Sequence, residues 1–389
     1  MIPDRSAGPA DDRVVVIGAG HAGLCVVSAL ARRDVGCTVI DGAVRLGDVW
    51  RHRYDDLRLN TARDASRIPG ATLPHDVGSW PTRDEWADHI ESAARQLGVE
   101  RRRERVERVE RRPRGWAVVC ADGEGRVGGG PVGEIAADAV VVATGRDRVP
   151  TIPPWPGLAS SPIEVIHSSS YHRPSPFVGR RVLVVGAGNS GTEIAHLLAS
   201  AGVEVTLSMR TRPVWARREL FGTDLTDLAI AGRAMPSWVV DASGRAMQPL
   251  LFGRMRAHGL GPPQRRLSQV HQASGATLDS GFVGDVKAGR IELVAAVERF
   301  DGAAVVLVDG SSSRPDVVIA ATGTTPALGE LLDDDLVDGG WPVCGEAPFE
   351  QAPGLFTAGL NPAELTAFHP DFIIEAEQIA DAIVTRLDR

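Results

Sequence analysis

The sequence predicts an α/β fold with two domains built on parallel sheets, the second domain inserted into the first. Residues 14–23 and 182–191 each join an apolar run to a G-x-G-x-x-G loop that opens an amphipathic segment. The chain has 389 residues, which suits two hydrophobic cores better than one. A last apolar strand at 354–359 follows the whole second unit. Each strand, glycine loop and helix is typical of a Rossmann-like, dinucleotide-binding domain, so two such domains are expected.

The composition is that of an ordinary globular protein, and it excludes several partners. Hydrophobic residues make up 43% and charged residues 24%, with a formal net charge of -8. Nucleic acid is excluded as a partner, because the arginine-rich stretch 101–105 contains Glu104 and is interpreted as a solvated face. Residues 1–12 lack the apolar core of a signal peptide, and no run of 18 apolar residues occurs. We therefore expect a cytoplasmic protein with no membrane partner.

The cysteines and histidines narrow the chemistry. Cys25, Cys37, Cys120 and Cys344 form no C-x-x-C pair, which indicates free thiols in a reducing compartment and weighs against an enzyme that uses a paired dithiol. The ten histidines contain no H-x-H or H-E-x-x-H pair, and we predict no metal site.

The elements of the first domain follow in order from the N-terminus. Residues 13–18 predict a buried strand, 22–33 a helix, and 37–40 a second strand that ends at Asp41. Thr82 and Glu85 form a capping box, which predicts a helix after it. Two antiparallel strands are expected within 104–120, around a turn at 113–115, and a further strand at 139–142.

The second domain begins after a linker marked by prolines at 150, 153, 154 and 156. A second βαβ unit spans 181–210. Further strands are expected at 291–294, 304–307 and 317–320, and a helix with one apolar face is expected over 373–387. Residues 211–280 have no clear period and are interpreted as a substrate subdomain or a surface helical excursion. We thus expect a flexible N-terminus at 1–12, one dinucleotide-binding domain at 13–150 and 324–389, and a second dinucleotide-binding domain at 151–323.

The first glycine loop has the chemistry of a dinucleotide site. Gly18 allows the tight turn, Gly20 lets the backbone approach a pyrophosphate, and Gly23 lets the helix pack on the strand. The helix N-terminus offers N–H groups and a positive dipole end to the phosphates. Asp41 would accept hydrogen bonds from a ribose diol and repel a 2′-phosphate, so this site suits FAD or NAD.

The second loop differs at the corresponding strand end. Gly186, Gly188 and Gly191 repeat the spacing, but the next strand ends at Arg210, with Arg212 two residues on. A guanidinium can pair bidentately with a 2′-phosphate and stack on adenine. This site therefore suits NADPH.

With these two loops, the chain resembles the class B flavin-containing monooxygenases over nearly its whole length. Residues 47–50 (GDVW) resemble the family's G-G-x-W segment with Asp48 in place of glycine, and residues 57–61 (LRLNT) its L-x-x-N-T segment. The A-T-G motifs at 143–145 and 321–323, and residues 354–359, also match. His167 and Tyr171 preserve the second half of F-x-G-x-x-x-H-x-x-x-[YF], whereas Ser161 and Ile163 replace its Phe and Gly. Residues 277–282 and 287–291 resemble the compact branch that includes plant and bacterial indole-pyruvate monooxygenases.

The resemblance implies an FAD- and NADPH-dependent monooxygenase that inserts one atom of O2 into a small organic substrate through a C4a-(hydro)peroxyflavin. Oxygenation at N or S, or beside a carbonyl, stays open. It implies Asn60 as the catalytic residue, bonded to the flavin or to NADP. The expected cofactor-binding residues are Gly18, Gly20, His21, Ala22, Gly23, Asp41, Gly47, Trp50, Asn60, Thr61, Ala143, Thr144, Gly145, Gly359, Gly186, Gly188, Asn189, Ser190, Gly191, Arg210, Arg212, His167, Thr322 and Gly323.

Plainer interpretations stand beside these. Asn60 could cap a turn, His167 could be a structural histidine at a domain junction, and Trp50 could be a core residue. An NADPH-dependent flavoprotein reductase without oxygen insertion, or a non-catalytic flavin-binding protein, would keep both loops. The expected partners are a small-molecule substrate and O2, and the sequence allows a homodimer.

Overall fold

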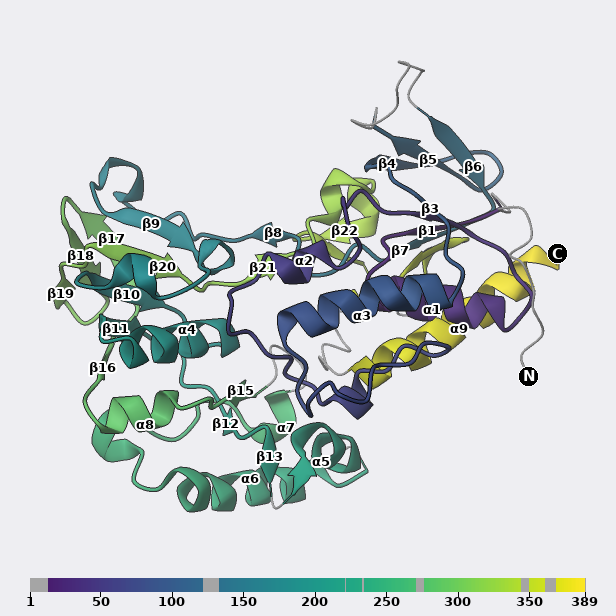
Figure 1. The fold of residues 1–389 in the computed structure, drawn as a ribbon. Coiled ribbons are helices and arrows are strands. Elements are labelled where there is room, and N and C mark those ends of the chain that lie inside the picture. The colour runs from purple at the N-terminus through teal and green to yellow at the C-terminus, as the bar shows by residue number, and fades with distance from the viewer. Residues whose placement is uncertain are drawn as a thin grey trace. The chain divides into compact units, whose positions relative to one another are not determined.

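The computed structural model describes residues 13–121, 133–220, 222–232, 234–270, 276–343, 350–360 and 369–388. The chain divides into two compact units (Figure 1). Unit 1 comprises Met1–Arg51, Thr61–Val149 and Thr324–Arg389, and unit 2 comprises His52–Asn60 and Pro150–Gly323. The predictions for residues 1–12 and Cys344 lie outside the described residues.

Unit 1 is organised around a six-stranded sheet in the order β24-β25-β7-β1-β2-β3. Strands β1 (Val14–Ile17), β2 (Thr38–Ile40), β3 (Arg101–Arg102), β7 (Ala139–Val142) and β25 (Leu355–Thr357) pair in parallel, and β24 (Glu350–Ala352) joins antiparallel. β1 and β7 are fully buried runs of Val, Ile and Ala, as strands covered on both faces require. This parallel order, with the glycine loop after β1, is the Rossmann-like arrangement that the sequence predicts.

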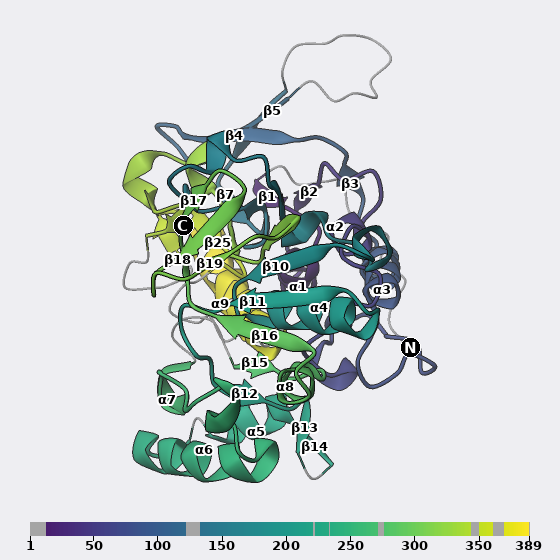
Figure 2. The same cartoon turned by 90° about the vertical axis from the view of Figure 1, so that its left-hand side faces the viewer.

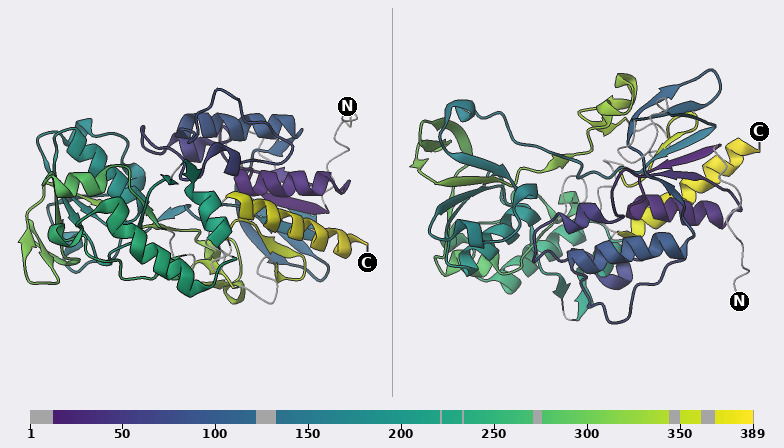
Figure 3. Two further views of the ribbon diagram at one scale, coloured as in Figure 1. Left: turned by 90° about the horizontal axis from the view of Figure 1, so that it is seen from below. Right: turned by 45° about the horizontal axis from the view of Figure 1, so that its top comes forward.

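Helices and a small sheet complete unit 1. Helix α1 (His21–Ala31) packs along α9 (His369–Leu387), as the views in Figure 3 show, and Arg33 forms ion pairs with Glu377 and Asp381 across them. Helix α3 (Arg83–Gln96) begins at the predicted capping box, in which Thr82 and Glu85 bond each other's backbone N–H. A short helix α2 (Asp48–Arg51) lies against α3. Strands β4 (Val106–Arg111), β5 (Trp116–Cys120) and β6 (Glu134–Ala137) form an antiparallel sheet.

Unit 2 repeats the Rossmann-like arrangement with a five-stranded sheet in the order β16-β11-β10-β20-β9. Its strands β9 (Glu164–His167), β10 (Arg181–Val185), β11 (Glu204–Ser208), β16 (Ile291–Val294) and β20 (Val317–Ala320) all pair in parallel. Helix α4 (Asn189–Ser200) packs on β10 and β11 (Figure 2), and α8 (Phe282–Lys287) packs on α4. Strands β17 (Val297–Asp301), β18 (Ala304–Leu307) and β19 (Ser312–Ser313) form a side sheet.

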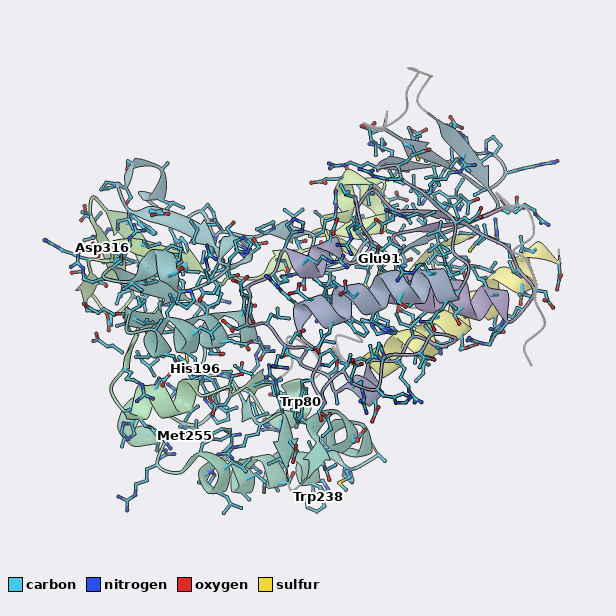
Figure 4. All side chains as sticks on the ribbon, in the orientation of Figure 1. Trp80, Glu91, His196, Trp238, Met255 and Asp316 are labelled. Carbon is cyan, nitrogen blue, oxygen red and sulfur yellow. The ribbon has the colours of Figure 1, made fainter. Side chains whose placement is uncertain are left out.

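The stretch 211–280 is built mostly from short pieces, together with one longer helix, α6. It contains β12 (Trp215–Ala216), β13 (Glu219–Leu220), β14 (Thr223–Asp224), α5 (Leu225–Gly232), α6 (Ser237–Phe252), α7 (Leu267–Val270) and β15 (Thr277–Leu278). Pro249 lies inside α6, and Trp238 on the same helix is 70% exposed (Figure 4). Trp215, by contrast, is buried and stacks on Phe282.

The remaining elements are short. They are strands β8 (Val149–Pro150), β21 (Thr324–Thr325), β22 (Val337–Asp338) and β23 (Trp341–Pro342), with 3-10 turns at Arg63–Ala65, Leu158–Ser160, Ser168–Ser170, Ser175–Phe177, Arg256–His258, Leu328–Glu330 and Asp334–Leu336. Among the described helices, none is both long and apolar enough to span a bilayer.

Candidate functional site: two glycine loops with unequal strand ends

The first glycine loop combines two tightly packed glycines with one open glycine. Gly18 has φ +102°, and a Cβ there would lie 2.4 Å from the carbonyl oxygen of Ala143. A Cβ on Gly23 would lie 2.0 Å from the carbonyl oxygen of Gly18. At Gly20, in contrast, no described heavy atom lies within 4 Å of an added Cβ. The loop therefore packs closely on the protein side and leaves its backbone approachable at Gly20, which fits a pyrophosphate.

The N-terminus of α1 is arranged for an anion. Its N-cap is Gly20, which has no side-chain cap, so the first-turn N–H groups can meet a phosphate. His21 is buried, and its Nε2 lies 3.3 Å from the carbonyl oxygen of Arg67. Burial lowers the pKa of His21 to about 3, so the ring is neutral at neutral pH. The backbone of this turn, and not a charged histidine, would hold the phosphates.

Asp41 is held at the end of β2 with its carboxylate facing the loop. Its Oδ2 accepts from the Ala19 N–H at 2.8 Å and its Oδ1 from the Ala43 N–H at 2.9 Å. Each carboxylate oxygen has further acceptor capacity, which suits a ribose diol. Arg101, which sequence reasoning assigned to a solvated face, instead donates to the carbonyl oxygens of Asp41, Ala43 and Val44, and its Nη1 lies 3.6 Å from Asp41 Oδ1. Its place in an arginine-rich stretch hid this role.

The turn after Asp41 shows what Asp48 does at the position where the G-G-x-W motif has its second glycine. Gly47 has φ +84°, and a Cβ there would lie 2.5 Å from the carbonyl oxygen of Ala87 on α3. Asp48 accepts from the Arg45 N–H at 2.8 Å and pairs with Arg51, so it stabilises the start of α2. Trp50 is half-buried and packs edge-to-face on Trp86, with ring centroids 6.4 Å apart. It is therefore more exposed than a plain core tryptophan.

Other predicted residues of unit 1 differ in how they are engaged. The Ala143 N–H donates to the carbonyl oxygen of Ile17. This hydrogen bond holds the start of the first A-T-G motif beside Gly18. Thr144 Oγ1 is buried and has no hydrogen-bond partner among the described residues, and Gly145 has φ +80°. The Gly359 N–H donates to Glu375 at 2.6 Å, and a Cβ on Gly359 would lie 2.9 Å from the Cβ of Ala22.

Asn60 and Thr61 stand at a boundary between the two units. The Thr61 hydroxyl is buried and lies 2.8 Å from that of Ser66. Asn60 is exposed, and its side chain has no hydrogen bond to another described residue. The turn-capping interpretation of Asn60 therefore has no support in the described contacts, and its amide is available to a ligand.

The second glycine loop reproduces the first. Gly186 has φ +120°, and an added Cβ would lie 2.3 Å from the carbonyl oxygen of Ala321. A Cβ on Gly191 would lie 2.0 Å from the carbonyl oxygen of Gly186, whereas Gly188 is open to 4 Å among the described atoms. Gly188 is the N-cap of α4 and likewise has no side-chain cap. The same backbone geometry thus occurs once in each unit.

Side chains around the second loop have separate tasks. Asn189 Oδ1 accepts from the Leu278 N–H at 2.7 Å, and Thr277 Oγ1 donates to the carbonyl oxygen of Ala187 at 3.1 Å. Asn189 therefore fastens β15 to the loop, a role that sequence reasoning did not predict. Ser190 is exposed at the first turn of α4.

The two arginines after β11 are not equivalent. Arg210 is exposed, and its guanidinium has no hydrogen bond or ion pair with any other described residue. Arg212 donates from Nε to the carbonyl oxygen of Pro262 at 3.0 Å, and its N–H donates to Gln264 Oε1 at 2.9 Å. Arg210 is thus free to meet a ligand, whereas Arg212 is partly occupied with the loop at 261–264.

His167 is engaged within unit 2. Its Nε2 donates to the carbonyl oxygen of Gly323 at 3.0 Å, and its Nδ1 accepts from the Ser169 N–H at 3.1 Å. Burial lowers the pKa of His167, and the neutral Nε2–H form satisfies both contacts. Thr322 donates from its hydroxyl to the carbonyl oxygen of Thr151. These contacts join the two strands that lead into and out of unit 2.

Comparison with known proteins identifies the family. Residues 12–228 match the family model described as pyridine nucleotide-disulphide oxidoreductase. The chain is 31% identical to indole-3-pyruvate monooxygenase YUCCA1 of Oryza sativa subsp. japonica over 332 residues, 82% of this chain and 78% of the relative. The chain belongs to the flavin-containing monooxygenase family. This flavin-containing monooxygenase is an oxidoreductase that uses FAD and NADPH.

Solved structures share the fold of this monooxygenase. The flavin-containing monooxygenase from Stenotrophomonas maltophilia superposes with a TM-score of 0.74 at 24% identity, over 96% of this chain and 98% of that chain. The bacillithiol disulfide reductase Bdr from Bacillus cereus superposes with a TM-score of 0.68 at 20% identity, over the same shares of the two chains. The mixed α/β fold with two dinucleotide-binding Rossmann-like domains is therefore confirmed.

The described thiols of the monooxygenase are unsuited to redox exchange. Cys25, Cys37 and Cys120 are free, and burial raises the pKa of each to about 12. At neutral pH they stay protonated, and the thiolate is the form that attacks a disulfide.

Proposed function

We propose that this monooxygenase transfers one oxygen atom from O2 to a small organic substrate, with FAD at the loop of Gly18–Gly23 and NADPH at the loop of Gly186–Gly191. The carrying observation is that two loops of equal backbone geometry end their βαβ units in opposite charges, Asp41 and Arg210. When bound, reduced FAD supplies the activation of O2 that amino-acid side chains lack. Residues of the chain must bind, orient and shield the reactants.

The FAD assignment is supported by the surroundings of Asp41. The open backbone at Gly20 and the uncapped start of α1 accommodate a pyrophosphate, and the two oxygens of Asp41 suit a ribose diol. A 2′-phosphate would be repelled by that carboxylate. Trp50, Thr144 and Gly145 are the residues we propose to contact the remainder of this cofactor.

The NADPH assignment is supported by the free guanidinium of Arg210. Gly188 and the uncapped N-terminus of α4 accommodate the pyrophosphate, as in the first loop. Arg210 would pair with the 2′-phosphate, and Ser190 would add a hydroxyl to the phosphate site. Arg212 would hold the neighbouring loop and approach the adenine from that position.

Asn60 is the residue we propose to act on the reacting cofactors. Its exposed amide has both a donor and an acceptor and no recorded hydrogen bond to another described residue. We propose that it bonds the flavin or the bound NADP and prevents the early escape of activated oxygen. Because relatives are named indole-3-pyruvate monooxygenases, 2-keto acids are the first substrates to assay, beside amines and sulfides.

The test is the fate of oxygen. Purified holoenzyme is incubated with NADPH, ¹⁸O2 and a panel of keto acids, amines and sulfides, and the products are examined by mass spectrometry. We expect one ¹⁸O atom per product molecule and one NADPH per turnover. Fast NADPH-dependent reduction of a disulfide or protein carrier, without ¹⁸O in any product, would instead establish the reductase to which the fold is also similar.

A further inference from the structure

A buried charged cluster in unit 2 is not used by either proposed cofactor site. Glu193 lies on α4, two residues after Gly191. The Tyr54 hydroxyl donates to Glu193 Oε2 at 2.6 Å, and Arg218 Nη2 lies 3.5 Å from Glu193 Oε1. The side chains of Glu193 and Arg218 are only 11% and 19% exposed, and Tyr54 is buried. We call these three residues the Glu193 clamp.

The clamp requires all three members. Burying a carboxylate is costly unless it is paired and hydrogen-bonded, and removing one partner leaves an uncompensated charge. Burial raises the pKa of Glu193, while the hydrogen bond from Tyr54 and the charge of Arg218 oppose that rise. Such a group defines one arrangement of its neighbours more strictly than apolar packing does.

The clamp joins three segments that are distant in the sequence. Tyr54 belongs to the segment 52–60, Glu193 to the helix behind the second glycine loop, and Arg218 to the chain between β12 and β13. Arg218 Nη2 also reaches the carbonyl oxygen of Arg58, at 3.5 Å. The clamp therefore grips the segment 52–60 at two points.

Further contacts hold the beginning of that segment. The Tyr54 ring packs against that of Tyr171, with centroids 6.1 Å apart, and Tyr171 packs against Phe177 at 5.8 Å. The Asp55 N–H donates to the carbonyl oxygen of His172 at 2.9 Å. Tyr171 is the aromatic end of the H-x-x-x-Y motif, so this motif supports the residue that bonds Glu193. Asn60 ends the same segment and is exposed.

We propose that Glu193 is a positioning residue, which holds the segment 52–60 on α4 through Tyr54 and Arg218 and thereby holds Asn60 in place for the reaction. This inference rests on the proposed role of Asn60. Because α4 begins at the glycine loop proposed for NADPH, the clamp joins the cofactor-binding helix and the Asn60 segment within one unit. Glu193 would act through Asn60 and touch neither the substrate nor the cofactors.

The clamp itself is tested by hydrogen exchange in the holoenzyme. The peptide spanning residues 52–60 is compared in the natural protein, Glu193→Ala and the matched control His196→Gln. His196 lies on the same helix and bonds Asp285 on α8 at 2.6 Å (Figure 4 labels His196). We expect roughly tenfold faster exchange of this peptide in Glu193→Ala and no change in His196→Gln. Unchanged exchange in Glu193→Ala, or an equal rise in both variants, overturns the clamp.

Positioning is tested by the leak of oxygen to H2O2. With NADPH and no added substrate, we expect Glu193→Ala and Asn60→Ala each to form H2O2 roughly tenfold faster than the natural protein. Glu193→Gln keeps an acceptor for Tyr54 and should give a smaller rise, whereas His196→Gln should give none. Adding Tyr54→Phe to Glu193→Ala should cause no further rise, because both remove the same contact.

The outcomes separate the two proposals. One outcome is that Glu193→Ala speeds hydrogen exchange of residues 52–60 but leaves the rate of H2O2 formation unchanged, whereas Asn60→Ala raises that rate. The positioning role of Glu193 is then overturned, and the role of Asn60 stands. If H2O2 formation is unchanged in Asn60→Ala, the proposed role of Asn60 fails, and with it positioning. The exchange experiment then still decides whether the clamp exists.

Discussion

At the scale of single residues, the two glycine loops differ by the side chains that end β2 and follow β11. The backbone at Gly20 and Gly188 is open in the same way, so the loops alone select no particular dinucleotide. Asp41 and Arg210 supply the difference in charge. Both residues could be predicted from the sequence because a strand end in a βαβ unit has a known position.

Arg210 should determine the preference for NADPH over NADH. Losing a charge-assisted hydrogen bond costs about 1.5–3 kcal/mol, so Arg210→Ala should raise the KM for NADPH roughly 10- to 100-fold and leave the KM for NADH nearly unchanged. Steady-state kinetics with both cofactors measure this. Arg212→Ala is the comparison, because its Nε contact to Pro262 predicts a loss of thermal stability with a smaller change in preference. Equal effects of Arg210→Ala on both cofactors would remove the 2′-phosphate assignment.

Gly18 and Gly20 should respond differently to alanine. At Gly18 the added Cβ would meet the Ala143 carbonyl oxygen and φ is +102°, so we expect Gly18→Ala to lose more than about 3 kcal/mol of stability. At Gly20 the methyl group meets no described atom within 4 Å, so the variant should fold with the Tm of the FAD-free natural protein but retain less FAD. Calorimetry and the ratio of flavin to protein absorbance distinguish the two. A Gly20→Ala protein with full flavin content would contradict a pyrophosphate at this loop.

At the scale of elements, regular strands and amphipathic helices were predictable, and side-chain cross-links were not. The capping box at Thr82 and the buried strands β1, β7, β10 and β20 follow from local patterns and are confirmed. The bonds of Asn189 to β15 and of Tyr54 to Glu193 join residues 89 and 139 positions apart, and no local pattern reports them. Most pieces of 211–280 are too short for a hydrophobic period to appear, and the longer helix α6 exposes apolar side chains such as Trp238 and Leu250, which blurs its period.

The packing of α1 against α3 should make the protein sensitive to acid. His21 and His89 are buried, and burial lowers their pKa values to about 3 and about 4. In the unfolded chain these two histidines bind protons below about pH 6.5, whereas in the folded protein they stay neutral. The folded state therefore keeps its full stability above pH 6.5 and loses stability as the pH falls toward about 4. At pH 5 each histidine should cost about 2 kcal/mol.

Thermal unfolding between pH 7.5 and 5 measures that dependence. His89→Leu should flatten the fall in Tm, because His89 makes no side-chain hydrogen bond with another described residue. An equal slope in the natural protein and in His89→Leu would contradict the assignment.

At the scale of the whole molecule, the fold and the family were predictable from the repeated loop, but the membership of residues 52–60 was not. The order of the sequence favours the first domain for this segment, because the segment lies between two parts of that domain. The structure groups it with unit 2, where Tyr54 packs on Tyr171 and bonds Glu193. A short segment that belongs to one unit while its neighbours in the sequence belong to the other is revealed only by long-range contacts.

The described cysteines should be inert in the native protein. Cys25 and Cys120 are buried and Cys37 is partly buried, and desolvation raises the pKa of each thiol to about 12. In a Cys344→Ser background, a thiol reagent at pH 8 should therefore label few of them until denaturant is added. Ellman's assay with and without guanidinium counts them. Rapid labelling of the native protein would show that at least one thiolate is accessible, and a thiol-dependent reaction would again be a candidate.

The arrangement of the two units also sets an order of events during synthesis on the ribosome. Unit 1 is completed by Thr324–Arg389, which supplies β25 beside β7 and α9 beside α1. Unit 2 ends at Gly323, so all of its strands leave the exit tunnel before those last elements do. Domains fold as units while the chain emerges. Unit 2 can therefore be assembled first, whereas the six-stranded sheet of unit 1 and the packing of α1 must await β25 and α9.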